Sequence, residues 1–98
     1  MTEHHDEFDR AARLTARANE VVSRFLATEV QAGMTLLDTA DASQDVAANE
    51  RRRALALEAY DVVSERLART GAAALILSDE EREEFVRAHA ELGRRLGR

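Results

Sequence analysis

Residues 18–37, ANEVVSRFLATEVQAGMTLL, decide the fold expected for the whole 98-residue chain. Apolar residues recur in this stretch at steps of three and four, the spacing that brings side chains to one face of an α-helix. The residues on that line are Ala18, Val22, Phe25 or Leu26, Val30, Gly33 and Leu37. We therefore predict a long amphipathic helix over residues 6–37, with residues 1–5 flexible ahead of it.

Gly33 lies inside this helical pattern. A glycine costs a helix interior about 1 kcal/mol relative to alanine, so the position needs a reason. Either the helix bends there, or a neighbouring backbone approaches closely, and we favour the close approach. Gly33 joins Val22, Phe25, Leu26 and Tyr60 as the candidate interface residues of this chain.

A second helix is expected over residues 43–69. Residues 38–43, DTADAS, combine the residue types that favour turns and helix N-caps. Asp41 with Gln44, or Ser43 alone, is the expected N-cap, and Gly71 is expected just past the C-terminus. The apolar line of this helix contains Val46, Ala56, Tyr60, Val63 and Leu67, widened by Leu55, Ala59 and Val62.

The next segment, residues 72–77 (AAALIL), has no polar side chain. A solvated loop does not have this composition, so we expect a short helical turn or a buried crossing segment that closes one end of a bundle. An edge strand or an oligomer contact is the alternative. Ser78 followed by Asp79, Glu80 and Glu81 is a capping box, which begins a third helix that ends near Leu96.

These helices predict an all-α fold, an antiparallel three-helix bundle that forms a single domain over residues 1–98. Proline is absent and glycine occurs four times, which suits long helices. Alanine supplies much of the apolar content, so the core should be thin. The third helix is too short to cover the two longer ones, which leaves an alanine-lined surface on them for a second copy or another protein.

The charge pattern is mostly explained by helix stability. Acidic residues gather at the predicted helix starts and arginines at the ends, as the helix macrodipole favours. Acids also precede arginines by four residues, for example at Glu20/Arg24 and Glu91/Arg95. Arg51, Arg52 and Arg53 gain nothing from the dipole. Three consecutive residues span about 200° of a helix, so we interpret them as a solvated or salt-bridged rim, with contact to an acidic partner as the alternative.

Composition excludes several classes of function. Cysteine is absent, so thiol chemistry, disulfides and Cys-ligated zinc are impossible. The net charge of −5 argues against nucleic acid or an anionic membrane as a partner. The sequence shows neither a secretory signal nor a membrane span of roughly 20 apolar residues. We expect a cytoplasmic protein without a cofactor.

Candidate catalytic and metal-binding groups are few. His4, His5 and His89 are the histidines of the chain, and their positions do not predict a metal site. Ser23 and Ser64 have no histidine at a suggestive spacing, and no nucleophile elbow, phosphate loop or zinc-protease motif occurs. We therefore expect no enzyme. His89 lies on the apolar line of the third helix, so it is a candidate pH-sensitive residue.

From about Phe25 onward, several features occur together: Gly33, Ala56 with Ala59-Tyr60-Asp61, Leu77-Ser78 before an acidic turn, and a close at Leu92, Leu96 and Gly97. In these features the chain resembles a loose group of short, uncharacterised bacterial helical proteins. The spacing of Ala56, Tyr60 and Val63 is also similar to that in the second helix of a tetratricopeptide unit, although the first-helix signature and a second copy are missing. These resemblances imply a helical scaffold and no particular activity.

The function predicted from the sequence is protein binding. We expect a small adaptor or regulatory subunit, homodimeric through the alanine-rich face of its first two helices and possessing contacts to another protein. Val22, Phe25, Leu26 and Tyr60 are the expected anchors, and Phe25→Asp is expected to disrupt both assembly and fold. The alternative is a sensor of a small molecule or of pH, with a cavity near His89.

Overall fold

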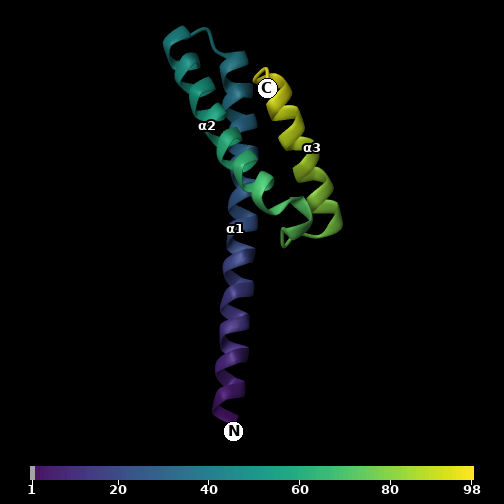
Figure 1. Cartoon of the computed structure of the whole chain (residues 1–98). Helices are drawn as coiled ribbons and strands as arrows, with labels where there is room; N and C mark the ends of the chain where they lie inside the picture. The colour runs from purple at the N-terminus through teal and green to yellow at the C-terminus, as the bar shows by residue number, and fades with distance from the viewer. Residues whose placement is uncertain (1) are drawn as a thin grey trace.

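The computed structural model describes residues 2–98, with side chains from Asp6 onward. It contains α1 (Thr2–Ala42), α2 (Val46–Thr70), a short 3-10 helix η1 (Ala72–Ala74) and α3 (Asp79–Arg95). The described part of the chain has no strand, and its three long helices run up, down and up (Figure 1). The predicted all-α three-helix fold is confirmed. The expectation that residues 1–5 are flexible concerns a segment of which only the helical backbone from Thr2 is described.

The bundle is formed at one end of a rod. The molecule measures 66 × 23 × 20 Å, and its long dimension is that of α1. α2 packs extensively along the C-terminal half of α1, and α3 makes a smaller contact with α1 and the smallest with α2. The N-terminal half of α1 extends beyond both of the other helices (Figure 1). The C-terminal half of α1 therefore packs in the bundle, and its N-terminal half is exposed to solvent.

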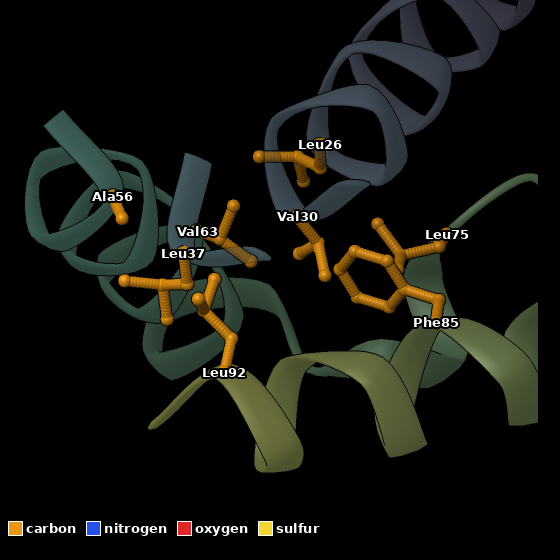
Figure 2. Packing of buried hydrophobic residues seen from close by; sticks show 8 residues of the cluster. All are labelled: Leu26, Val30, Leu37, Ala56, Val63, Leu75, Phe85 and Leu92. Carbon is orange, nitrogen blue, oxygen red and sulfur yellow. The ribbon is translucent and has the colours of Figure 1, made fainter. Parts of the chain in front are cut away.

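The core lies where α1, α2 and α3 meet, and it is small. Leu92 of α3 and Val63 of α2 are completely buried between the helices. Phe85 of α3 lies beside Leu75, at the right of Figure 2. At its centre α1 contributes one line of aliphatic residues at helical spacing. The buried apolar residues of that line are Leu26, Val30, Leu37 and Ala40. The sequence left Phe25 and Leu26 as alternatives, and the structure places Leu26 in the core.

The connection between α1 and α2 differs from the expectation. α1 continues through residues 38–42, which were expected to form the connector, so the connection is shorter. The N-cap of α2 is Asp45, whose carboxylate accepts a hydrogen bond from the Ala48 N–H at 3.1 Å. Ser43 instead accepts a bond from the Asp45 N–H at 3.2 Å. The prediction of Asp41 or Ser43 as the cap is therefore wrong, because a longer α1 keeps Asp41 within its last turn.

Asp41 is used for a contact between helices. Its two carboxylate oxygens pair with Arg53 of α2 at 3.0 Å and with Arg95 of α3 at 2.9 Å. Arg95 also pairs with Asp38 at 2.8 Å, and these contacts raise the pKa of its guanidinium. The carboxylate of Asp38 is the largest contribution. The predicted Glu91/Arg95 pair is not formed, since Glu91 pairs with Arg94.

Gly33 is buried at the closest approach of α1 to its neighbours. A Cβ atom there would lie 2.9 Å from a terminal methyl of Leu92 and 3.7 Å from the carbonyl oxygen of Ala56. α1 is one continuous helix through Gly33. The close neighbour is the Leu92 side chain, whereas the nearest backbone atom, the Ala56 oxygen, is at an ordinary contact distance, so the expected close approach of a backbone is not what Gly33 accommodates. Gly93 of α3 has the same role opposite Tyr60, whose ring atoms would lie 2.8 Å from a Cβ.

The apolar connector after α2 is a short helical turn, as one of the two expected forms requires. Gly71 has a φ of 76°, and η1 follows it directly. Leu75 is buried in the core, and the Ile76 N–H donates to the hydroxyl of Ser23 at 2.8 Å. Ser23, almost fully buried, donates in turn to the Asn19 carbonyl at 2.8 Å. Ser23 thus ties the connector to α1, and the Arg82 guanidinium donates to the Leu75 and Leu77 carbonyls from α3.

α3 begins as predicted. The Ser78 hydroxyl accepts a bond from the Glu81 N–H at 3.1 Å, and the Glu81 carboxylate accepts one from the Ser78 N–H at 3.1 Å. Glu81 also pairs with Arg24 of α1 at 2.8 Å. The bonds from Ser78, and then the bond from Arg24, lower the pKa of Glu81. Arg24 was expected to pair with Glu20 on its own helix, but it reaches α3 instead.

Candidate interaction surface

The N-terminal half of α1 carries an apolar face that none of the described side chains from Asp6 onward covers. Every described residue from Asp6 to Val21 is exposed. Large apolar side chains are among them: Phe8 is 75% exposed, Leu14 60% and Val21 63%. Phe25, one of the predicted anchors, is 51% exposed just beyond this segment. Exposed apolar side chains that fall on one line are more informative than isolated ones, which are common on any protein surface.

Leu14, Val21 and Phe25 follow a regular spacing that continues past the N-terminal half of α1, whereas Phe8 lies outside this repeat. Steps of three and four connect them, so the line repeats every seven residues. Such a line drifts by only about 20° per repeat around a helix and stays on one side of it. We call this line the seam. Its members are Ala11, Leu14, Ala18, Val21, Phe25, Thr28 and Ala32, all exposed.

At its C-terminal end the seam meets a groove between α1 and α2. The groove has a volume of about 490 Å³, and its floor is apolar. Ala32 belongs to both the seam and the groove, so the apolar surface is continuous from one to the other. Three carboxylates, those of Glu29, Glu58 and Asp61, stand in the groove wall. The other lining residues are Ala32, Leu36, Leu55, Ala59 and Val62.

The five predicted interface residues are separated by the fold. Phe25 lies on the exposed seam, and Val22 is partly buried beside the core. Leu26 and Gly33 are buried within the chain, and Tyr60 is half-buried against Gly93. The packing of a single chain already accounts for the burial of Leu26 and Gly33. Phe25 is thus the member of the predicted set that offers a large apolar area to a partner.

The arginine triplet lies on the rim of the bundle. Arg53 pairs with Asp41 at 3.0 Å, and Arg52 donates to the Asn49 side chain, one turn earlier on α2, at 2.8 Å. Arg51 is exposed. The three side chains diverge around α2, as their spacing requires, so they do not form one binding site. These contacts agree with the interpretation of the triplet as a solvated or salt-bridged rim. The contact of the triplet with an acidic partner stays a prediction.

His89 is half-buried between α2 and α3. Its ring stacks on Tyr60 with centroids 4.8 Å apart and 9° between the planes, and Phe85 lies 6.4 Å away on the same helix. Its Nε2 atom is 2.8 Å from the Ser64 hydroxyl. Burial lowers the pKa of His89, because the surroundings disfavour the charged ring.

Sequence reasoning missed the pairing of Ser64 with His89. The two residues are far apart along the chain, and only the packing of α3 on α2 brings them together. A serine beside a histidine is the start of a nucleophilic site, but acyl transfer also needs an oxyanion site and a place for the substrate. The groove and the other surface hollows described for this chain are lined by residues other than Ser64 and His89.

Metal sites and membrane spans are two other classes of feature to consider among the described residues. No group of three or more His, Cys, Asp or Glu side chains from Asp6 onward is placed to hold a metal ion. No described helix is both long enough and apolar enough to cross a membrane. The side chains of His4 and His5 lie outside the described residues. No family model, curated protein or solved structure matches the chain.

Proposed function

We propose that this protein is a non-enzymatic helical interaction module, a small adaptor or regulatory subunit that works as a homodimer. The observation that carries the proposal is the continuous apolar surface formed by the seam and the groove. It extends along α1 and turns onto α2 without a charged residue on its central line. Contiguous apolar patches of several hundred Å² are typical of surfaces that bind another protein.

The N-terminal half of α1, residues 6–21, which we call the free half, gives a second and independent argument for this proposal. Isolated helices of fewer than about 15 residues are marginal in water, and most helical stability in proteins comes from packing of an apolar face. The segment from Asp6 to Val21 has such a face and no packing within the chain. A partner that covers the seam supplies the missing contact. An exposed half-helix is therefore a natural binding element.

Molar mass in solution tests the proposal. Light scattering at pH 8 and at pH 5.5 should give about twice the 10.9 kDa of one chain at both values. Phe25→Asp places a charge on the central line of the seam and should reduce the mass to that of a single chain. Because Phe25 is half-exposed, helical content should be retained, which revises the expectation that this change also disrupts the fold.

Val86→Asp is the matched control. Val86 is an exposed apolar residue of α3, of similar exposure to Phe25 but outside the seam and the groove. The dimer mass should persist in this variant. A single-chain mass for the unchanged protein at micromolar concentration contradicts the homodimer, and equal effects of the two variants would exclude the seam as the binding surface.

The surroundings of His89 favour one second candidate, a pH-responsive module. Protonation would place a charge on a ring that stacks against Tyr60 and bonds to Ser64. In that case the molar mass would change between pH 8 and pH 5.5, and His89→Phe would remove the change. A dimer at both values of pH supports the adaptor instead.

A further inference from the structure

We infer that the occupant of the groove is the free half of α1 from a second copy, so that two chains pair antiparallel and each fills the groove of the other. This inference rests on the proposed homodimer and adds its arrangement. A twofold pair makes the same contact twice, with one surface contributed by each chain. The groove is incomplete without the partner, and the free half of α1 has no other cover.

A chain cannot fill its own groove. Leu14 and Ala32 belong to the same continuous helix, α1, and lie about 27 Å apart along it at 1.5 Å per residue. The helix has no break at which its N-terminal half could fold back. The occupant must therefore come from another molecule, and the free half of a second copy carries a matching apolar line of the same repeat.

The spacing of the seam fits an antiparallel pair. In such a pair the apolar positions of a seven-residue repeat from the two chains face each other layer by layer. One register sets Leu14 opposite Ala32. The same register sets Ala18 opposite Thr28, and Val21 opposite Phe25. It also places Phe8 level with the end of the groove that Leu36 lines, where an exposed aromatic ring finds apolar walls.

Charge selects the antiparallel orientation. The free half contains Arg10, Arg13 and Arg17 with no acid between them. In the antiparallel register these arginines lie level with residues 29–36 of the other copy, a stretch of α1 that carries the Glu29 carboxylate and no arginine. In a parallel, in-register pair each arginine would lie beside its own copy. Charges this close are within the Debye length of about 8 Å at physiological salt, so the parallel pair would be repelled.

The surface is large enough for a stable dimer. A phenylalanine carries roughly 150–250 Å², so the exposed parts of Phe8 and Phe25 together supply about 250 Å². This is roughly a third of the 800 Å² that each partner buries in a typical specific complex. The seam also exposes Leu14 and Val21, and α2 adds the exposed side chains of Leu55 and Val62 on the groove.

Disulfide trapping tests the arrangement, because the chain contains no cysteine of its own. Leu14→Cys and Ala32→Cys chains are mixed, unfolded together, refolded and oxidised. The mixture should form a disulfide between the two different chains, identified by mass spectrometry. Either variant alone should remain uncrosslinked, since its two cysteines would lie about 27 Å apart and a disulfide needs Cα atoms within about 7 Å.

A mixture of Leu14→Cys with Ala90→Cys is the control for random collision, because Ala90 is exposed on α3 away from the seam. The yield with Ala32→Cys should be roughly tenfold higher or more, since held cysteines react at a millimolar effective concentration. Crosslinking of Leu14→Cys alone would overturn the antiparallel pair in favour of a parallel one. A dimer mass with only the control yield would overturn the arrangement and leave the homodimer standing, whereas a single-chain mass would overturn both.

Discussion

The two halves of α1 are built from one continuous helix and have opposite surroundings. From residue 22 to 42, α1 buries Leu26, Val30 and Leu37 against α2 and α3. From Asp6 to Val21, its apolar residues repeat at the same helical spacing and are all exposed. The difference does not come from helix propensity, because both halves are rich in good helix formers. It comes from which half has a neighbour in the same chain.

This contrast shows that amphipathic spacing predicts a helix but not its partner. In the bundle half of α1, residues 22–42, the apolar line packs against apolar residues of α2 and α3, which follow later in the sequence. In the free half no such residues lie alongside, because α2 and α3 both pack beside the C-terminal half of α1 (Figure 1). The seam is consequently the part of the molecule whose stability should depend most on protein concentration.

The largest expected loss of stability comes from Leu37, a buried leucine in residues 22–42 of α1. Leu14, an exposed leucine in residues 6–21, is its matched control. In the Phe25→Asp background, which should hold single chains, Leu37→Ala should lower the free energy of unfolding by about 2–5 kcal/mol, because Leu37 is buried and its loss leaves a cavity. Leu14→Ala in the same background should change it by less than about 0.5 kcal/mol, since Leu14 is exposed there. Urea unfolding monitored by circular dichroism measures both.

Without the Phe25→Asp change the comparison becomes sharper. Leu14→Ala should then raise the dissociation constant of the dimer about tenfold or more, because it removes roughly 1.5 kcal/mol of buried leucine surface or more from each contact. An equal loss of single-chain stability from the two substitutions would contradict the division of α1 into a bundle half and a free half.

A smaller effect is expected at the boundary between the halves, where Ser23 holds the connector. Ser23→Ala removes the acceptor of the Ile76 N–H and should cost about 1 kcal/mol of stability, the net contribution of a partly buried hydrogen bond. Thr39→Ala is the control, an exposed hydroxyl residue of α1 within the bundle half. Thermal unfolding of the two variants at equal concentration tests this, and equal melting temperatures would mean that the connector does not depend on Ser23.

Much of the fold could be predicted from the sequence, because the signals that define its helices are local. The capping box at Ser78, the glycine after α2 and the apolar line of α1 each act within one or two helical turns. Contacts between helices were not accessible in the same way. Arg24 pairs with Glu81, rather than with Glu20, only because the turn that begins α3 packs beside α1.

The candidate interaction surface could be predicted only in part from the sequence. Phe25 and an alanine-lined face were predicted, and the seven-residue repeat from Ala11 to Ala32 is present in the sequence. The division between core and seam was not, because Phe25 and Leu26 are adjacent and either fits a helical line. Packing against α2 and α3 decides which of the two turns inward. The Ser64 and His89 pair likewise depends on the crossing of α2 and α3.

A pH dependence is expected from His89 within the bundle half. Its folded pKa lies below the unfolded value, so the unfolded chain binds a proton more readily than the folded one. Stability should therefore be full above the unfolded pKa of about 6.5 and fall as the pH drops through that value toward the folded pKa. The melting temperature at pH 5.5 should be lower than at pH 8.

His89→Phe keeps an aromatic ring against Tyr60 and removes the titration. This variant should melt at nearly the same temperature at both values of pH, since carboxylates with ordinary pKa values are already ionised at pH 5.5. If the variant retained the whole difference, a group other than His89 would be responsible.

The smallest effect is expected at the arginine triplet. Arg52→Glu removes a hydrogen bond to Asn49 on the same helix and should change the unfolding free energy by no more than about 0.5 kcal/mol, as surface substitutions usually do. Arg95→Glu is the contrasting change on the same rim, because it places a third carboxylate beside Asp38 and Asp41 and removes two ion pairs. It should cost about 1 kcal/mol or more. If Arg52→Glu instead cost as much as Arg95→Glu, Arg52 would have to contact something beyond its own helix turn, and the dimer would be the place to look for it.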